Sequence, residues 1–146
     1  MRASSACTDL IKRFDGLTTK AFRQHDGLWV IGYGHRSSEQ HAEVVTKDKA
    51  ELMLRADVKA LARKVESALD AAEVEITQAQ FDALVANAYA CGFAAFITSS
   101  LWDCIERGDF NGALQAFDDL GHDKCPFARN KRLRRQAEKM LFMSAS

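Results

Sequence analysis

The chain has 146 residues, a length that suits one domain or two small lobes sharing a core without the need for disulfides or a metal. Its 20 basic and 20 acidic side chains cancel, so no overall field attracts nucleic acid or anionic lipid. No apolar run reaches the ~18–20 residues of a membrane span, and residues 1–10 lack the apolar core of a signal peptide. We therefore expect a soluble monomer that is made in the cytoplasm, binds no nucleic acid and does not insert stably into membranes.

The first predicted elements are an amphipathic helix and a small hairpin. Gly16 ends the helix, which leaves the carboxylate of Asp15 at its C-terminus. Two extended segments follow, at residues 18–22 and 28–33, and the polar residues 23–27 between them contain Asp-Gly, a strong turn signal. A carboxylate at a helix end beside a twisted hairpin is well placed to hold a polar group over a cleft.

A long helix is predicted next. Residues 37–45 are polar and irregular, which indicates an exposed loop or a ragged strand. Thr46 is the expected N-cap of a helix over residues 47–69, whose charged face, Lys49 through Glu66, is expected to be solvated. The apolar residues at helical spacing, and therefore the expected buried positions, are Leu52, Val58, Leu61, Ala62, Val65 and Leu69.

The rest of the chain is predicted to be helical. Thr77 caps a hydrophobic helix over residues 78–91 that Gly92 ends, with Phe81, Leu84, Val85, Ala88 and Tyr89 buried. Shorter helices follow at 101–107, capped by Ser99 or Ser100, and at 110–120, capped by Asp109. Residues 121–128 form a loop around Pro126, and a last helix spans 130–143. Its five basic residues from Arg129 to Arg135 could bind an anionic partner. The favoured interpretation is a charged face covering the C-terminal lobe, with Glu138 pairing nearby.

The cysteines give no sign of a metal site. Cys7, Cys91, Cys104 and Cys125 are dispersed, without the spacing of a zinc motif. Their simplest interpretation is buried thiols, with Cys91 in the core of its apolar helix. We expect no metal and no cofactor.

Three stretches of sequence resemble one family. Phe14, Gly16, Ala21, Gly27, Trp29, Ile31, Gly32, Tyr33, Gly34 and His35 follow the pattern F-E-G-x-x-x-x-A-Y-x-D and then G-x-W-T-I-G-Y-G-H. The segment FDALVANAYACGFAAFITSSL, beginning at Phe81, and the closing Arg134-Arg135-x-Ala137-Glu138-x-x-Leu141 match further motifs. Over roughly residues 5–143 the chain is similar to the phage-type lysozymes, the peptidoglycan-cleaving glycoside hydrolases that include phage endolysins.

The resemblance implies an α+β, mostly helical, lysozyme-like fold in a single domain over residues 1–146. A small N-terminal lobe with a helix and a β-hairpin would cover about residues 5–45. A linking helix over about 46–70 would join it to a helical lobe over about 71–146. Family endolysins are made in the cytoplasm and reach the cell wall when the cell lyses.

The resemblance also locates the catalytic positions, and all three are substituted. The family's glutamate corresponds to Asp15, its aspartate to Gln24 and its threonine to Val30. Glycoside hydrolysis needs an acid to protonate the leaving oxygen and a second group to activate water or stabilise the transition state. Asp15 is one methylene shorter than Glu, Gln24 cannot act as a base, and Val30 has no hydroxyl to orient water. General acid–base assistance is worth about 10²–10⁴-fold, so activity is expected to be impaired or absent.

Other residues could take part at such a site. Asp26 and His25, beside Gln24, are candidate substitutes, although Asp26 can equally belong to the Asp-Gly turn and His25 to a solvated loop. By resemblance, Tyr33 and His35 would line the groove that binds glycan.

Three hypotheses remain for the function. The chain could be a working or weakened muramidase with Asp15 as general acid and Asp26 assisting. It could be a glycan-binding relic with a degenerate site, a pseudoenzyme of phage or prophage type. It could also be a lysozyme scaffold reused inside the cell to bind an unidentified protein. The partner is thus either peptidoglycan glycan strands or a protein, and the substitutions favour lost or impaired catalysis.

Overall fold

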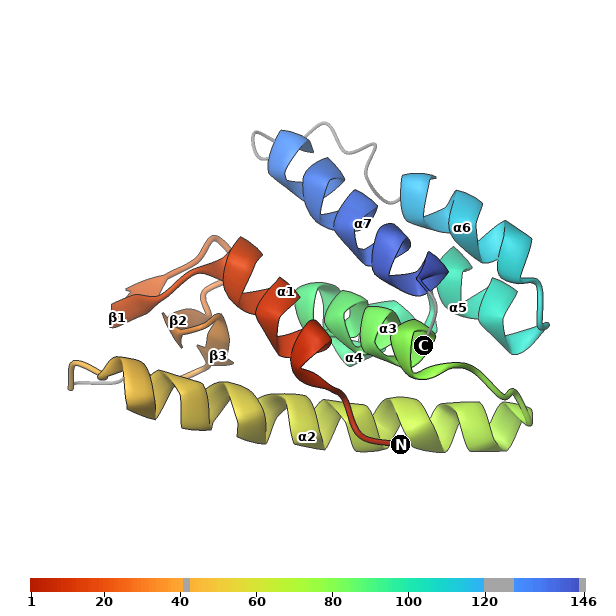
Figure 1. Cartoon of the computed structure of the whole chain (residues 1–146). Helices are drawn as coiled ribbons and strands as arrows, with labels where there is room; N and C mark the ends of the chain where they lie inside the picture. The colour runs from red at the N-terminus through yellow and green to blue at the C-terminus, as the bar shows by residue number, and fades with distance from the viewer. Residues whose placement is uncertain (41–42, 120–127, 145–146) are drawn as a thin grey trace.

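A computed structural model describes residues 1–40, 43–119 and 128–144 of the chain, and within it the side chains of 128 and 129 are not described. The fold is mostly helical with one small antiparallel sheet, which confirms the predicted class. Figure 1 shows the sheet at one end of the long helix α2 (Lys47–Ala72). Helices α1 (Ser5–Asp15) and α3 (Gln78–Cys91) lie next to α2, and α7 (Ala128–Met143) packs on their other side. Helix α3 contacts α1, α2, α7 and the short helix α4 (Phe93–Ile97), so the hydrophobic core is built around it.

The N-terminal helix and strands lie close to their predicted positions. Helix α1 spans Ser5–Asp15, and the strands are β1 at Thr18–Arg23, β2 at Trp29–Gly32 and β3 at His35–Ser37, in the order β1-β2-β3. The third strand was not predicted: the second extended segment was expected to end at residue 33, and residues 37–45 were interpreted as a loop or ragged strand. It exists because Tyr33 and Gly34 make a tight turn, which Gly34 allows with a φ of +81°.

Helix α2, Lys47–Ala72, confirms the helix predicted over residues 47–69 and its Thr46 cap. The Thr46 hydroxyl accepts a hydrogen bond from the Lys49 amide, with the two atoms 3.1 Å apart. The buried residues are Ala50, Leu54, Val58, Ala62, Val65 and Leu69. The prediction for Leu52 was wrong, because 65 % of its side chain is exposed. A residue two positions from Ala50 points to nearly the opposite side of a helix, and the true apolar stripe begins at Ala50.

Helix α3, Gln78–Cys91, was predicted with its bounds, its Thr77 cap and its buried residues. Thr77 and Gln80 form a reciprocal capping box, in which each side chain accepts a hydrogen bond from the other residue's amide. The prediction that Cys91 lies in the core was wrong: it is the last residue of α3 and is exposed. Gly92 ends the helix directly after it, so the Cys91 side chain emerges at the rim of the core rather than inside it.

The remaining helices are α4 at Phe93–Ile97, α5 at Ser100–Glu106, α6 at Phe110–Asp119 and α7 at Ala128–Met143. Helix α4 was not predicted, because five residues are too few for a clear apolar period. Ser99 rather than Ser100 caps α5, and the Asp109 carboxylate accepts from the Gly112 amide at 2.9 Å, as expected of a cap. Residues 120–127 lie outside the described part, together with most of the predicted loop, Pro126 and Cys125.

Among the described residues, no helix combines the length and apolar character needed to cross a membrane.

Candidate functional site

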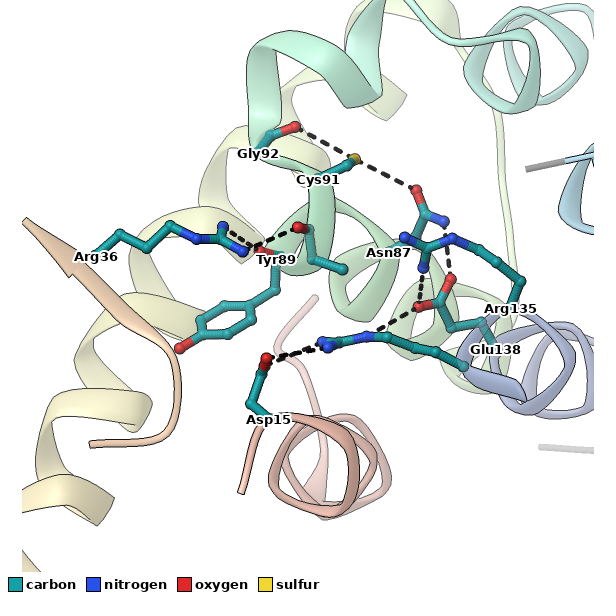
Figure 2. A network of polar contacts seen from close by, with 10 residues as sticks. Asp15, Arg36, Asn87, Tyr89, Cys91, Gly92, Arg135 and Glu138 are labelled. Atoms are coloured by element: carbon teal, nitrogen blue, oxygen red, sulfur yellow. Dashed lines mark hydrogen bonds and ion pairs between the residues drawn. The ribbon is translucent and has the colours of Figure 1, made fainter. Parts of the chain in front are cut away.

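The Asp15 carboxylate is held by an arginine from the other end of the chain. Arg134 of α7 donates from Nη1 to Oδ1 at 3.1 Å and from Nη2 to Oδ2 at 3.2 Å, and the side chains are 11 % and 20 % exposed respectively. Both carboxylate oxygens are therefore engaged by one guanidinium in a bidentate, charge-assisted pair. Figure 2 shows the Asp15 carboxylate pointing from the end of α1 towards this network. A negative charge at a helix C-terminus is unfavourable, and the arginine offsets it.

The hairpin packs directly against the same carboxylate. A Cβ added to Gly34 would lie 3.0 Å from both Cγ and Oδ2 of Asp15, closer than carbon and oxygen atoms normally approach. Gly34 therefore serves two purposes, since its positive φ makes the turn and its missing side chain leaves room for Asp15. The local sequence, with a helix end and a glycine turn, brings the carboxylate and the hairpin backbone together.

Arg134 belongs to a buried polar cluster that also contains Asn87, Arg135 and Glu138. Glu138 is fully buried, contacts Nη1 of Arg135, and accepts a hydrogen bond from Asn87 Nδ2 at 2.8 Å. Arg134 Nε lies 3.6 Å from Glu138 Oε2 and makes no hydrogen bond in the described structure. Burial raises the pKa of Glu138, while Arg135, Asn87 and Arg134 act in the opposite direction. The expected pairing of Glu138 is confirmed. Of the predicted charged face, Lys131 and Arg132 are exposed, whereas Arg134 and Arg135 are buried against α3.

The sheet is tied to α3 by two further side chains. The Tyr89 hydroxyl donates to the Tyr33 carbonyl at 2.5 Å, and burial raises the pKa of this phenol. Arg36 of β3 donates from Nη1 to the Tyr89 carbonyl at 3.2 Å and from Nη2 to the Ala90 carbonyl at 3.1 Å. These carbonyls belong to the last turn of α3, where cations are favourable partners. Figure 2 shows Arg36 reaching from the strand to this helix end.

We predict that Arg36→Ala lowers the free energy of unfolding by about 1 kcal/mol, because two hydrogen bonds between the sheet and α3 are lost. Urea denaturation measures this loss, and hydrogen exchange should speed up in β2 and β3. Arg23→Ala is the matched control, since within the described parts of the chain the Arg23 side chain makes only a local hydrogen bond, from Nε to the Gly27 carbonyl at 3.4 Å. Equal losses in both variants would show that Arg36 does not tie the sheet to α3.

The two predicted groove residues have different surroundings. His35 Nδ1 lies 2.7 Å from Asp57 Oδ2, so the imidazole anchors β3 to α2. Tyr33 is only 6 % exposed and belongs to the core, with Lys12 Nζ 5.6 Å from the centre of its ring. Of the two side chains, His35 therefore presents the larger surface to a ligand.

The remaining predicted site residues are spread over the hairpin. Val30 in β2 is 5 % exposed and lies opposite both Phe22 and Arg36 in the sheet. Gln24 pairs through its backbone with Leu28, and its side chain makes no hydrogen bond to the described residues.

The two candidate substitutes lie in the turn itself. The Asp26 carboxylate accepts from the Leu28 amide at 3.0 Å, and both Asp26 and His25 are exposed. This hydrogen bond favours the interpretation of Asp26 as a turn residue.

Sequence reasoning missed Arg134 and Arg36 as site residues. The Arg-Arg-x-Ala-Glu motif signalled α7, but nothing in a linear pattern indicated that its arginine would reach Asp15. Among the described residues, no group of three or more histidine, cysteine, aspartate or glutamate side chains is arranged to hold a metal ion.

Comparison with known proteins gives consistent matches. Residues 12–138 match the family model for phage lysozyme. An endolysin of Acyrthosiphon pisum secondary endosymbiont phage 1 is 36 % identical over 140 residues, covering 93 % of this chain and 94 % of the relative. An endolysin of Bacillus phage B103 is also 36 % identical, over 99 % of this chain but 55 % of its own length.

Solved structures agree with this fold. The muramidase domain of SpmX from Asticaccaulis excentricus superposes with a TM-score of 0.87, at 32 % identity and 99 % coverage of both chains. An endolysin from Escherichia coli O157:H7 phage FAHEc1 gives a TM-score of 0.82 at 27 % identity, covering 100 % of this chain and 96 % of the other.

Proposed function

Because this chain belongs to the phage lysozyme family, we propose that it is a muramidase-like protein that binds peptidoglycan glycan strands and hydrolyses them weakly or not at all. The observation that carries this proposal is the state of Asp15, the side chain at the position of the family's glutamate. Both of its carboxylate oxygens accept hydrogen bonds from Arg134. Its side chain is also one methylene shorter than that of glutamate.

A carboxylate in this setting is a poor general acid. To protonate a leaving oxygen its carboxyl group must project beyond its partners, whereas both oxygens of Asp15 face the Arg134 guanidinium in a bidentate pair. The shorter side chain displaces the acid by roughly 1 Å, and a misplacement of that size can cost about a hundredfold. Rotation of the Asp15 side chain to bring the carboxylate closer to a substrate is opposed by Gly34, which lies directly beside the carboxylate.

The other two positions give no replacement for the missing chemistry. Gln24 has an amide in place of a base, and the buried Val30 has no hydroxyl with which to hold a water. Asp26, the nearest spare carboxylate in sequence, is engaged in its own turn. We propose that Gln24, Val30 and Asp15 together define a degenerate site, with His35 contributing to the remaining glycan surface.

We expect the natural chain to release no more soluble muropeptide from purified peptidoglycan than its Asp15→Ala variant, because Asp15 is not an effective acid. Muropeptide analysis by chromatography and loss of turbidity of sacculi measure this. The chain should nevertheless sediment with intact sacculi, since glycan binding does not require the acid.

The outcomes separate the three hypotheses. Robust release that Asp15→Ala abolishes would establish a working muramidase and contradict the proposed loss of activity. Absence of release together with absence of binding to sacculi would contradict glycan recognition and favour a scaffold that binds protein.

A further inference from the structure

A second concave site lies away from Asp15, between the N-terminal segment and the long helix. It has a volume of about 650 Å³, and its lining comes from residues 1–8 and from α2. Its floor is apolar and includes Ala3, Val58 and Ala62, of which the latter two are buried. None of the residues of the Asp15 site lines this hollow.

Four basic side chains surround that floor. Arg55, Lys59 and Arg63 stand at successive i, i+4 positions along α2, and Arg2 faces them from the N-terminal segment. All four are exposed, and none forms an ion pair with another side chain in the described parts of the chain. Of the described residues lining the hollow, Glu66 is the only acid, and it contacts the amino group of Met1. The site is thus locally cationic on a chain whose net charge is zero.

We propose that this hollow, defined by Arg2, Ala3, Arg55, Val58, Lys59, Ala62 and Arg63, binds an acidic peptide segment of a protein partner. Side chains four residues apart on a helix are separated by roughly 6 Å along its axis. Alternate residues of an extended peptide are separated by roughly 6.7 Å, so acidic residues at every second position meet Arg55, Lys59 and Arg63 in register. The side chains between them point away from the hollow, so its apolar floor contacts the methylene groups of the acidic side chains themselves.

The balance of charge favours a peptide over a nucleic acid. Proteins that bind nucleic acid non-specifically are usually basic overall, because affinity comes from many phosphate contacts. Here the chain as a whole is neutral, and the four basic side chains surround a hollow with an apolar floor. Arginine is suited to binding an acidic peptide, because its planar guanidinium group can donate two hydrogen bonds to one carboxylate.

The experiment measures binding of a fluorescein-labelled peptide of alternating glutamate and valine to the full chain by fluorescence anisotropy. Binding should weaken about tenfold, or ~1.4 kcal/mol, in the triple variant Arg55→Gln, Lys59→Gln and Arg63→Gln. The matched control, Lys20→Gln, Lys47→Gln and Lys49→Gln, changes the net charge equally on exposed residues outside the hollow and should stay within about twofold. Thermal unfolding confirms that both variants are folded.

Three further readouts complete the test. A peptide with glutamine in place of glutamate should not bind, and a single-stranded oligonucleotide of equal charge should bind more weakly. Amide shift changes in the natural chain should be confined to residues 2–8 and 55–66. Equal weakening in both triple variants, equal affinity for the oligonucleotide, shift changes located elsewhere, or no binding of the acidic peptide would each overturn the proposal.

Discussion

Restoring the family residues with Asp15→Glu, Gln24→Asp and Val30→Thr together is expected to raise muropeptide release at least about a hundredfold above that of the natural chain. An acid of full length, a second carboxylate and a hydroxyl would all return, and general acid–base assistance is worth about 10²–10⁴-fold. Groups that act as a unit do not add simply, so the triple variant should exceed the product of the single variants.

The matched control for this gain is Asp15→Gln with Gln24→Asp and Val30→Thr. Glutamine has nearly the shape of glutamate but cannot donate an acidic proton, so this control should remain at the level of the natural chain. If both triple variants release no muropeptide while still binding sacculi, the groove has lost more than these three residues. A natural chain as active as the restored one would show that Asp15 suffices, and the proposed degenerate site would then be wrong.

The second large effect concerns stability. Glu138→Ala should lower the free energy of unfolding by about 3–5 kcal/mol, because it leaves Arg134 and Arg135 buried without their carboxylate and Asn87 without its acceptor. Chemical denaturation followed by circular dichroism measures this loss. Because Arg134 also holds Asp15, the variant should lose order at the end of α1 as well as in α7.

A surface ion pair between α6 and α7 provides the comparison. Lys139 Nζ lies 2.8 Å from Asp118 Oδ2, and both side chains are partly exposed. Asp118→Ala should therefore cost no more than about 1 kcal/mol. A cost for Glu138→Ala as small as that for Asp118→Ala would show that the buried cluster contributes little net stability, as can happen when desolvation cancels ion-pair attraction.

The helices and the hairpin were predictable because their signals are local. Thr46 and Thr77 mark helix starts through hydrogen bonds to amides three residues away, and Asp26-Gly27 marks its turn through an equally short contact. The spacing of apolar residues shows that a segment is helical more reliably than it shows which side of the helix is buried. Helix α2 was therefore predicted, while Leu52 was wrongly expected to be buried. Likewise, Cys91 belongs to an apolar run yet is exposed, because burial depends on what packs against the end of α3.

The sequence by itself determined the family and the mostly helical fold, and it predicted a degenerate site at positions 15, 24 and 30, because all of these rest on residue type and spacing along the chain. Only the tertiary structure decided what surrounds them. Asp15 and Arg134 are 119 residues apart, and no local pattern encodes their contact. The burial of Glu138 and the cationic hollow likewise arise from elements that meet only when the chain folds, since desolvation and charge clustering are properties of packed surfaces rather than of sequence.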